Sequence, residues 1–301
     1  MSQPQPAAKF AAYLELGKLR LSSLAILAVL AGILMGSPVQ TPEIGMLMGT
    51  LLGTALIAIG GNAMNMYMER ETDVLMDRTE QRPIQTGRLQ PTEVRNFALL
   101  MFVVGVLLLI VSSNLYATLL CGSIFLTYVL IYTPMKRRSN LNTLVGAVPG
   151  ALPPVVGYVA VTEQLDAYAG LLFLIVFFWQ IPHFLAIAWR YRDQYENAGL
   201  IMLPVEDTDG RRTGLHMVTY GFTLLAVSVF PAAPSFGLFS PFYFYLALVL
   251  GVLFLITTVI AAIQRSETTM RLCFLASIIY LPLVFAAMVY DRVLQLADGA
   301  V

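Results

Sequence analysis

One short stretch of the chain carries side chains whose types and spacing suit a divalent metal. Asn65, Glu69, Asp73 and Asp77 recur at every fourth residue. On a helix, each step of four drifts by about 40°, so the first three share an arc of about 80°, and Asp77 lies at its edge, about 120° from Asn65. Stacked carboxylates repel one another unless a cation lies between them. Their oxygens and the amide oxygen suit Mg²⁺, so the sequence predicts a magnesium site with these four residues as ligands.

Arginines follow this cluster closely along the chain. Arg78, Arg82 and Arg88 offer forked donors that match phosphate oxygens, and a metal held by the acids would bridge them to the same phosphates. A simpler interpretation is a solvated helix end with the ordinary bias of basic residues toward the cytoplasm. We favour the metal site because acids that adjoin an uninterrupted apolar span are costly and tend to be functional.

Transmembrane helices must position these groups. Hydrophobic residues make up 58% of the 301 positions and charged residues 12%, and the mean hydropathy is +0.75, which a soluble domain could not bury. Uncharged runs approach the roughly 20 residues that cross a bilayer, and in lipid such runs must be helical. We expect one all-α domain over residues 1–301, a polytopic membrane bundle with a polar tail at residues 1–17. The expected nine spans are 21–36, 46–66, 97–113, 115–134, 141–160, 168–188, 215–233, 242–263 and 271–290.

Basic residues give this bundle a direction. Of the 18 Lys and Arg residues, all but Arg292 fall on one side of the nine-span arrangement. Because such residues collect in cytoplasmic loops, we expect an inner-membrane protein with its N-terminus inside and its C-terminus outside. The two long inner loops, 69–95 and 189–214, then hold an active site at the cytoplasmic face. The net charge of zero gives no reason to expect nucleic acid.

The first cluster resembles the first motif of the UbiA-type membrane prenyltransferases. Asn65, Glu69 and Asp73 have its spacing, and Arg82 with Pro83 is similar to the Arg-Pro pair that follows it. The run 65–70 resembles one branch of that family, the protohaem IX farnesyltransferases. Further similarities to this branch lie at 132–138, 142–157, 179–184, 189–195 and 202–204.

The resemblance implies a reaction and a set of residues. The protein would transfer a farnesyl group from farnesyl diphosphate to a vinyl group of protohaem IX with Mg²⁺ as cofactor, in a membrane that supplies haem-copper oxidase assembly. The implied catalytic residues are Asn65, Glu69, Asp73, Lys136 and Arg137. The implied substrate contacts are Arg78, Arg82, Arg88, Tyr132, His183, Arg192, Asp193 and Tyr195.

Two of these residues keep open roles. His183 lies within an apolar span, where its neutral imidazole would ligate haem iron, hydrogen-bond the substrate or simply pack. The stretch around Asp193 departs from the D-x-x-x-D motif of family members that act on quinone precursors. We therefore expect no second metal held like the first. Arg190 and Arg192 would instead meet the diphosphate or a haem propionate, with Asp193 as an orienter or as a metal ligand.

Two other functions remain as alternatives. A prenyltransferase with an aromatic quinone-precursor acceptor would use the same diphosphate site, and the altered second motif argues against it. A haem-handling or transport protein without enzymatic activity would use buried charges to line a path through the bilayer. That function predicts charges at all depths, whereas the charges of this chain gather at one rim.

Overall fold

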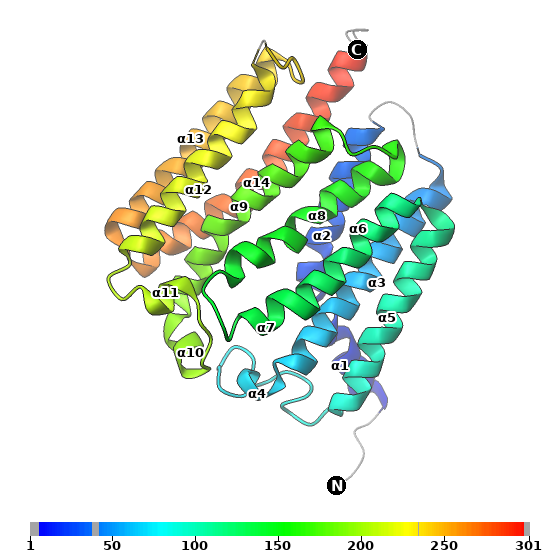
Figure 1. Ribbon diagram of the computed structural model, residues 1–301, viewed down its shortest axis with the longest axis vertical. Helices are drawn as coiled ribbons and strands as arrows, with labels where there is room; N and C mark the ends of the chain where they lie inside the picture. The colour runs from blue at the N-terminus through cyan, green and yellow to red at the C-terminus, as the bar shows by residue number, and fades with distance from the viewer. Residues whose placement is uncertain (1–5, 38–41, 234, 298–301) are drawn as a thin grey trace.

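The computed structural model describes residues 6–37, 42–233 and 235–297, and this part of the chain is all-helical. The predicted fold class is therefore confirmed. One long helical segment corresponds to each expected span (Figure 1). They are α2 (Leu19–Gly36), α3 (Ile44–Met68), α5 (Pro91–Ser112), α6 (Leu115–Leu126) continued by the π-helix η1 (Thr127–Tyr132) and α7 (Thr133–Met135), α8 (Asn142–Thr162), α9 (Ala167–Arg190), α12 (Arg211–Val229) continued by the 3-10 helix η2 (Phe230–Ala232), α13 (Pro241–Gln264) and α14 (Glu267–Ala297).

These segments have the length and composition of membrane helices. Among the described residues, eight are long and apolar enough to cross a bilayer. The shorter apolar helix is the part Ser22–Gly36 of α2. The protein is therefore an integral membrane protein.

The bundle has two halves that meet at α2 and α8. In one half α3 packs along α5 and α6, and in the other α12 and α13 pack beside α9 and α14 (Figure 1). The backbones of α2 and α8 touch where they cross. A Cβ atom on Gly157 would lie 1.9 Å from the carbonyl oxygen of Val29, and one on Gly32 would lie 1.9 Å from that of Pro154. Such close contact through small residues is how membrane helices associate without a hydrophobic driving force.

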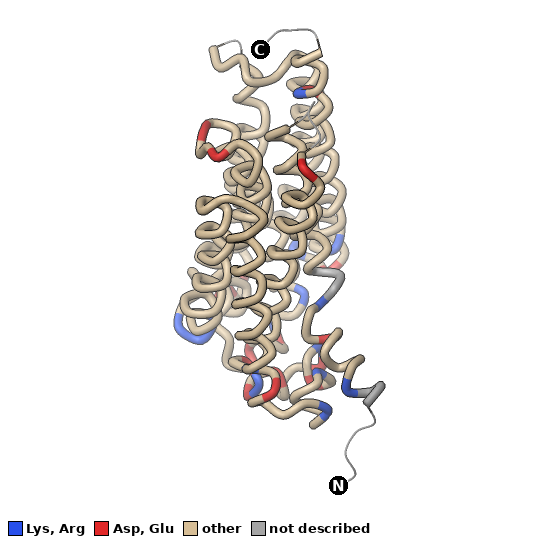
Figure 2. The backbone as a smooth tube through the Cα atoms, turned by 90° about the vertical axis from the view of Figure 1, so that its right-hand side faces the viewer, with Lys and Arg blue, Asp and Glu red and all other residues tan. Residues whose placement is uncertain are grey.

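Short helices gather at one end of the bundle, which we call the loop end (Figure 1). They are α1 (Pro6–Leu16), α4 (Arg70–Asp73), α10 (Arg192–Asn197) and α11 (Leu203–Glu206). Figure 2 shows most of the Lys and Arg residues in this part of the molecule. Arg292 lies near the opposite end, where its guanidinium donates to the Tyr168 hydroxyl at 3.2 Å. The charge distribution thus follows the sequence prediction.

Helix α1 differs from the prediction. We expected a polar tail at residues 1–17, but within the described part Pro6–Leu16 is a helix, while residues 1–5 lie outside it. Ala12 and Leu16, one helical turn apart, are fully buried against the first half of the bundle. Lys9 forms an ion pair with Glu93 at the start of α5. The helix forms because this apolar face has a surface to pack on.

Candidate active site

Asn65, Glu69 and Asp73 form a ladder at the loop end of α3. The backbone amide of Glu69 donates to the carbonyl of Asn65 at 2.9 Å, and that of Asp73 donates to the carbonyl of Glu69 at 2.8 Å. Glu69 is the point where α3 ends and α4 follows, with φ −91° and ψ 6°, yet the four-residue hydrogen bonds continue across it. All three side chains are buried. The shared face that the spacing predicted is therefore present.

Each acid of this ladder lies against a cation from elsewhere in the chain. Nζ of Lys136, just after α7, lies 2.7 Å from Oε1 of Glu69, and Arg82 pairs with Oδ2 of Asp73. Burial works to raise the pKa of Glu69, but the ammonium of Lys136 holds that pKa below its usual value. Burial raises the pKa of Asp73 despite the opposing effect of Arg82. The site thus concentrates charge where the apolar span ends.

The ladder has donor atoms to spare for a metal ion. Oδ1 of Asp73 is buried and has no hydrogen-bond partner in the described structure. Nδ2 of Asn65 donates to Oγ1 of Thr133 at 3.2 Å, which commits the amide nitrogen and leaves its oxygen available. No three His, Cys, Asp or Glu side chains gather as a metal site among the described residues. The residues present still fit Mg²⁺, because that ion is commonly held by one or two carboxylates together with water and substrate phosphate.

Asp77 does not join this ladder. Helix α4 ends at Asp73, whose carbonyl oxygen accepts a 2.8 Å hydrogen bond from Oγ1 of Thr79 as the chain turns away. Asp77 is exposed, and its Oδ2 accepts a hydrogen bond from Gln194 at 3.3 Å. The interpretation of Asp77 as a fourth ligand assumed a helix that continues to residue 77, and the structure separates it from the other three.

A cavity of about 230 Å³ adjoins Glu69 at the loop end. Its lining comprises Met68, Glu69, Thr133, Pro134, Arg137, Arg138 and Leu200. Arg137 and Arg138 are exposed, and neither forms an ion pair with an acid of the described part of the chain. One carboxylate beside two available guanidinium groups can receive a phosphate that shares a metal with that carboxylate.

The other predicted arginines have different positions. Arg78 lies over the rings of Tyr191 and Tyr195, at 5.2 and 5.6 Å from their centroids, and donates to the Tyr195 hydroxyl at 3.2 Å. It therefore joins the first inner loop to the second. Arg88 instead pairs with Glu15 of α1 at 2.7 Å and is remote from the acid ladder in its contacts. In this structure Arg88 therefore fastens α1, and its contact with a substrate stays a prediction.

The second inner loop brings fewer groups to the ladder than expected. The guanidinium of Arg192 lies 4.7 Å from the centroid of the Trp189 ring. The side chain of Asp193 is 89% exposed, and its ion pair within the described part of the chain is with Arg192, at 3.4 Å. This loop is nevertheless fixed to the first half, since the amide of Ile201 donates to the carbonyl of Lys136 at 2.7 Å.

Tyr132 stands beside the acid ladder. Its ring centroid lies 4.8 Å from Nζ of Lys136 and 5.3 Å from the centroid of the Tyr128 ring, which is tilted against it by 31°. The opposite neighbour is Gly146 of α8, where a Cβ atom would lie 2.5 Å from the Tyr132 ring. Glycine at this position therefore lets the aromatic ring fill the space between the two helices.

His183 is held in a defined orientation within α9. Its ring contacts those of Trp179 and Phe274, with centroid distances of 5.0 and 4.8 Å. Nδ1 is 2.7 Å from Oγ of Ser277, and that hydroxyl donates to the carbonyl of Phe274 at 2.6 Å. Because the hydroxyl proton is committed, Nδ1 is the donor to Oγ and Nε2 carries the lone pair. The imidazole thus presents an acceptor or metal-ligating nitrogen.

Lys18, which in the sequence is one of the basic residues that orient the bundle, lies close to the ladder in the structure. The residue has a left-handed backbone, with φ 43° and ψ 56°, at the start of α2. Burial, together with the neighbouring charges of Arg82 and Lys136, lowers the pKa of Lys18 to about 7. The sequence signal for this residue was its position directly before the first apolar run. Its closeness to the ladder depends on the packing of α2 against α3, which the sequence does not show.

Comparisons with known proteins agree with this arrangement. The UbiA prenyltransferase family matches residues 25–288. A protoheme IX farnesyltransferase of Solibacter usitatus is 38% identical over 288 residues, covering 93% of this chain and 98% of the relative. One of Sorangium cellulosum is 43% identical over 241 residues, covering 79% and 84%.

Solved structures share the fold at low sequence identity. A digeranylgeranylglyceryl phosphate synthase superposes with a TM-score of 0.76 at 17% identity, covering 95% of this chain and 99% of that one. A UbiA homolog from Archaeoglobus fulgidus bound to DMAPP and Mg²⁺ gives a TM-score of 0.64 at 14% identity, covering 92% and 98%. The chain belongs to the UbiA prenyltransferase family.

Proposed function

We propose that this protein transfers the farnesyl group of farnesyl diphosphate to a vinyl group of protohaem IX. Diphosphate leaves as the new carbon–carbon bond forms, and water supplies the hydroxyl group of the product, haem O. The observation that carries the reaction type is the buried ladder of Asn65, Glu69 and Asp73. In the described structure one Asp73 oxygen has no partner, and the acids pair with Arg82 of the first inner loop and with Lys136 of the segment after α7. The choice of haem as acceptor is supported by relatives over most of the chain that bear the name protoheme IX farnesyltransferase.

The diphosphate end of the substrate would lie at the acid ladder. Asn65, Glu69 and Asp73 would hold Mg²⁺, which supplies Lewis-acid stabilisation of the leaving diphosphate. Lys136 and Arg82 already lie at the carboxylates, so their charges need no reorganisation when negative charge develops on the leaving group. Arg137 at the adjoining cavity would bind a further phosphate oxygen.

The hydrocarbon end would lie within the bundle. Each methylene moved from water to an apolar environment contributes about 0.8 kcal/mol, which favours a bound farnesyl chain among the membrane helices. Tyr132 lies against Lys136 beside the ladder, and Tyr128 contacts the Tyr132 ring. Their ring faces would stabilise the positive charge that develops on the allylic carbon as its bond to oxygen breaks.

The acceptor would meet residues of the second half. His183 presents the Nε2 lone pair and would ligate haem iron, which fixes the position of the porphyrin. Arg192 at the loop end would pair with a propionate, because its guanidinium rests on Trp189 and meets only the exposed Asp193. These contacts would direct one vinyl group toward the allylic carbon.

We further propose that the loop end faces the cytoplasm, with the N-terminus inside and the C-terminus outside. The concentration of basic residues at that end supports this orientation. The membrane would be a cytoplasmic membrane whose haem-copper oxidases use the product.

The test uses purified protein in detergent with haem, farnesyl diphosphate and Mg²⁺. Mass spectrometry should detect haem that has gained one farnesyl group and one hydroxyl group. A parallel reaction with 4-hydroxybenzoate as acceptor should give no product. Product from the hydroxybenzoate and none from haem would refute the acceptor, and no product from either would refute the prenyl transfer.

A further inference from the structure

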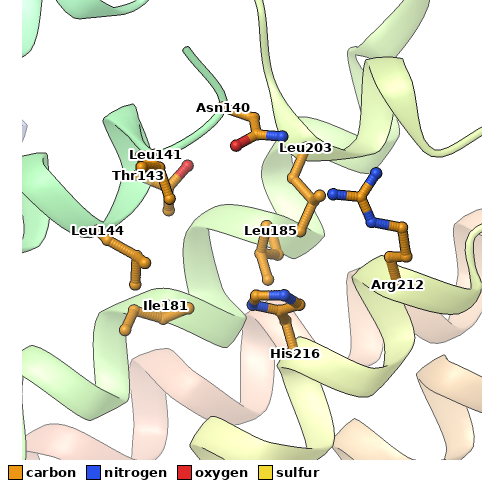
Figure 3. Close-up of a pocket in the computed structure, with 9 residues that line it drawn as sticks. All are labelled: Asn140, Leu141, Thr143, Leu144, Ile181, Leu185, Leu203, Arg212 and His216. Atoms are coloured by element: carbon orange, nitrogen blue, oxygen red, sulfur yellow. The ribbon is translucent and has the colours of Figure 1, made fainter.

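A second cavity lies at the level of the loop end, between α8, α9, α11 and α12 (Figure 3). Its volume is about 190 Å³. The apolar part of its lining comprises Leu141, Leu144, Ile181, Leu185 and Leu203, and the polar part comprises Asn140, Thr143, Arg212 and His216. Such a pairing of apolar floor and cationic rim suits a molecule with an anionic head and a hydrocarbon body.

This cavity is separate from the proposed reaction site. Ile181 lines it, whereas His183, two residues along α9, contacts Ser277 of α14. Leu144 lines it, whereas Gly146, two residues along α8, faces Tyr132. Two residues on a helix differ by about 200°, so both helices turn opposite sides to the two sites.

Arg212 brings a charge to this cavity that no acid of the described structure balances by an ion pair. The nearby acids are engaged elsewhere. Oδ2 of Asp207 accepts the backbone amide of Thr213 at 2.6 Å, and Glu206 accepts a hydrogen bond from Asn140. A guanidinium at an apolar cavity without a carboxylate partner is a binding position for an external anion.

His216 extends this position by one helical turn. It lies four residues after Arg212 on α12, and Figure 3 shows both side chains directed toward the space between Leu203 and Leu185. Its ring lies 5.9 Å from the Tyr220 ring, and its nitrogens form no hydrogen bond within the described residues. Four residues correspond to about 6 Å along the helix axis. This distance is similar to that between the phosphate of a lipid headgroup and the first carbons below it.

The volume of this cavity and its depth in the membrane indicate which kind of molecule it binds. A volume of about 190 Å³ lies below the roughly 300–1,000 Å³ of sites that enclose drug-sized ligands, which argues against a porphyrin. Arg212 is the second residue of α12, so the site lies at the rim of an apolar span. Leu141 at its edge is half exposed. We propose that this cavity binds the phosphate headgroup of an anionic phospholipid of the surrounding bilayer, held by Arg212 and His216.

The test measures lipid binding to purified protein in a neutral maltoside detergent. Dihexanoyl phosphatidylglycerol is titrated and its adducts are counted by native mass spectrometry, with dihexanoyl phosphatidylcholine and inorganic phosphate as comparison ligands. Arg212→Gln should weaken phosphatidylglycerol binding about tenfold, as expected for the loss of a charge-assisted pair. Arg211→Gln is the matched control, because Arg211 is its neighbour with the same charge, exposed and paired with Asp209.

The proposal requires one saturable phosphatidylglycerol in the wild type, retained within about twofold by Arg211→Gln. Arg212→Lys, which keeps the charge and the fold but loses the fork, should bind with intermediate affinity. Equal weakening by Arg211→Gln and Arg212→Gln would overturn it in favour of diffuse surface charge. Wild-type affinity in Arg212→Gln, equal binding of phosphatidylcholine, or competition by inorganic phosphate at the lipid's own concentration would each overturn it as well.

Discussion

Nζ of Lys136 lies 2.7 Å from Oε1 of Glu69, although the two residues are 67 positions apart in the chain. Both side chains are largely buried, with 15% and 9% of their surfaces exposed. This contact fastens the segment after α7 to the end of α3 and places a cation where a diphosphate would depart. Structure and reaction therefore depend on the same pair, and a double substitution can separate the two contributions.

Lys136→Met should lower both stability and activity. It leaves the Glu69 carboxylate buried without its cation, a loss that typically costs about 3–5 kcal/mol. It should also reduce kcat by roughly 10²–10³, as does the loss of one electrostatic contact to a developing anion. The double variant Glu69→Gln with Lys136→Met should recover much of the melting temperature without recovering turnover. Recovery of both would show that Lys136 has only a structural role.

Lys18 should make stability depend on pH. Burial and the charges of Arg82 and Lys136 lower its pKa to about 7, from 10.5 as a free side chain. Between these values the unfolded chain holds a proton that the folded protein releases, so this residue makes the protein more stable as the pH rises from 7 toward 10.5. Lys18→Met should therefore melt higher than wild type at pH 6.5, by a margin that shrinks toward pH 10. A margin that stays constant with pH would contradict this location of Lys18.

His183 should determine how haem binds. In the wild type, ligation by Nε2 should shift the Soret band of added haem, and His183→Leu should abolish that shift while leaving the KM for farnesyl diphosphate unchanged. His216→Leu is the control, because His216 lies in the cavity on the other side of α9. An identical haem spectrum in wild type and His183→Leu would leave His183 as a packing residue.

The α2–α8 crossing should tolerate no added methyl group. Gly157→Ala places Cβ against the backbone of Val29, and overpacking of this kind costs about 1–3 kcal/mol. Gly122→Ala is the matched control, since nothing lies within 4 Å of its Cβ position on α6. Thermal unfolding in detergent should show a lower melting temperature for Gly157→Ala only. Equal behaviour of the two variants would mean that the helices do not cross this closely.

Periodicity and hydropathy were sufficient to predict the helices and the shared face of the ladder, because these structures depend on residues that are close together in the chain. The spacing of Asn65, Glu69 and Asp73 determines a shared face on any helix, even one that bends at Glu69. The end of that helix was not predictable in the same way. The chain leaves the helix after Asp73, where Thr79 donates to the Asp73 carbonyl, so the structure does not bring Asp77 to the ladder. Its role as a metal ligand stays a prediction.

The contacts between side chains far apart in the chain also could not be predicted from the sequence. Arg82 and Arg88 are the same residue type in the same inner loop, so the sequence does not distinguish their partners. In the structure Arg82 pairs with Asp73, whereas Arg88 pairs with Glu15 of α1. That difference depends on the presence of α1, which the sequence analysis treated as a polar tail. The contact of Arg78 with Tyr195 likewise requires the two inner loops to meet, a tertiary fact with no local signal.

The most direct test of the account compares Asp73→Asn with Asp77→Asn. Both remove one carboxylate and keep the side-chain shape, but only Asp73 belongs to the buried ladder, while Asp77 is exposed and bonded to Gln194. Farnesylated haem is measured by mass spectrometry at saturating farnesyl diphosphate and Mg²⁺, with the melting temperature as a check on folding. The account predicts at least a thousandfold loss of turnover in Asp73→Asn and less than a threefold loss in Asp77→Asn. Near-normal turnover in a folded Asp73→Asn, or equal losses in both variants, would contradict it.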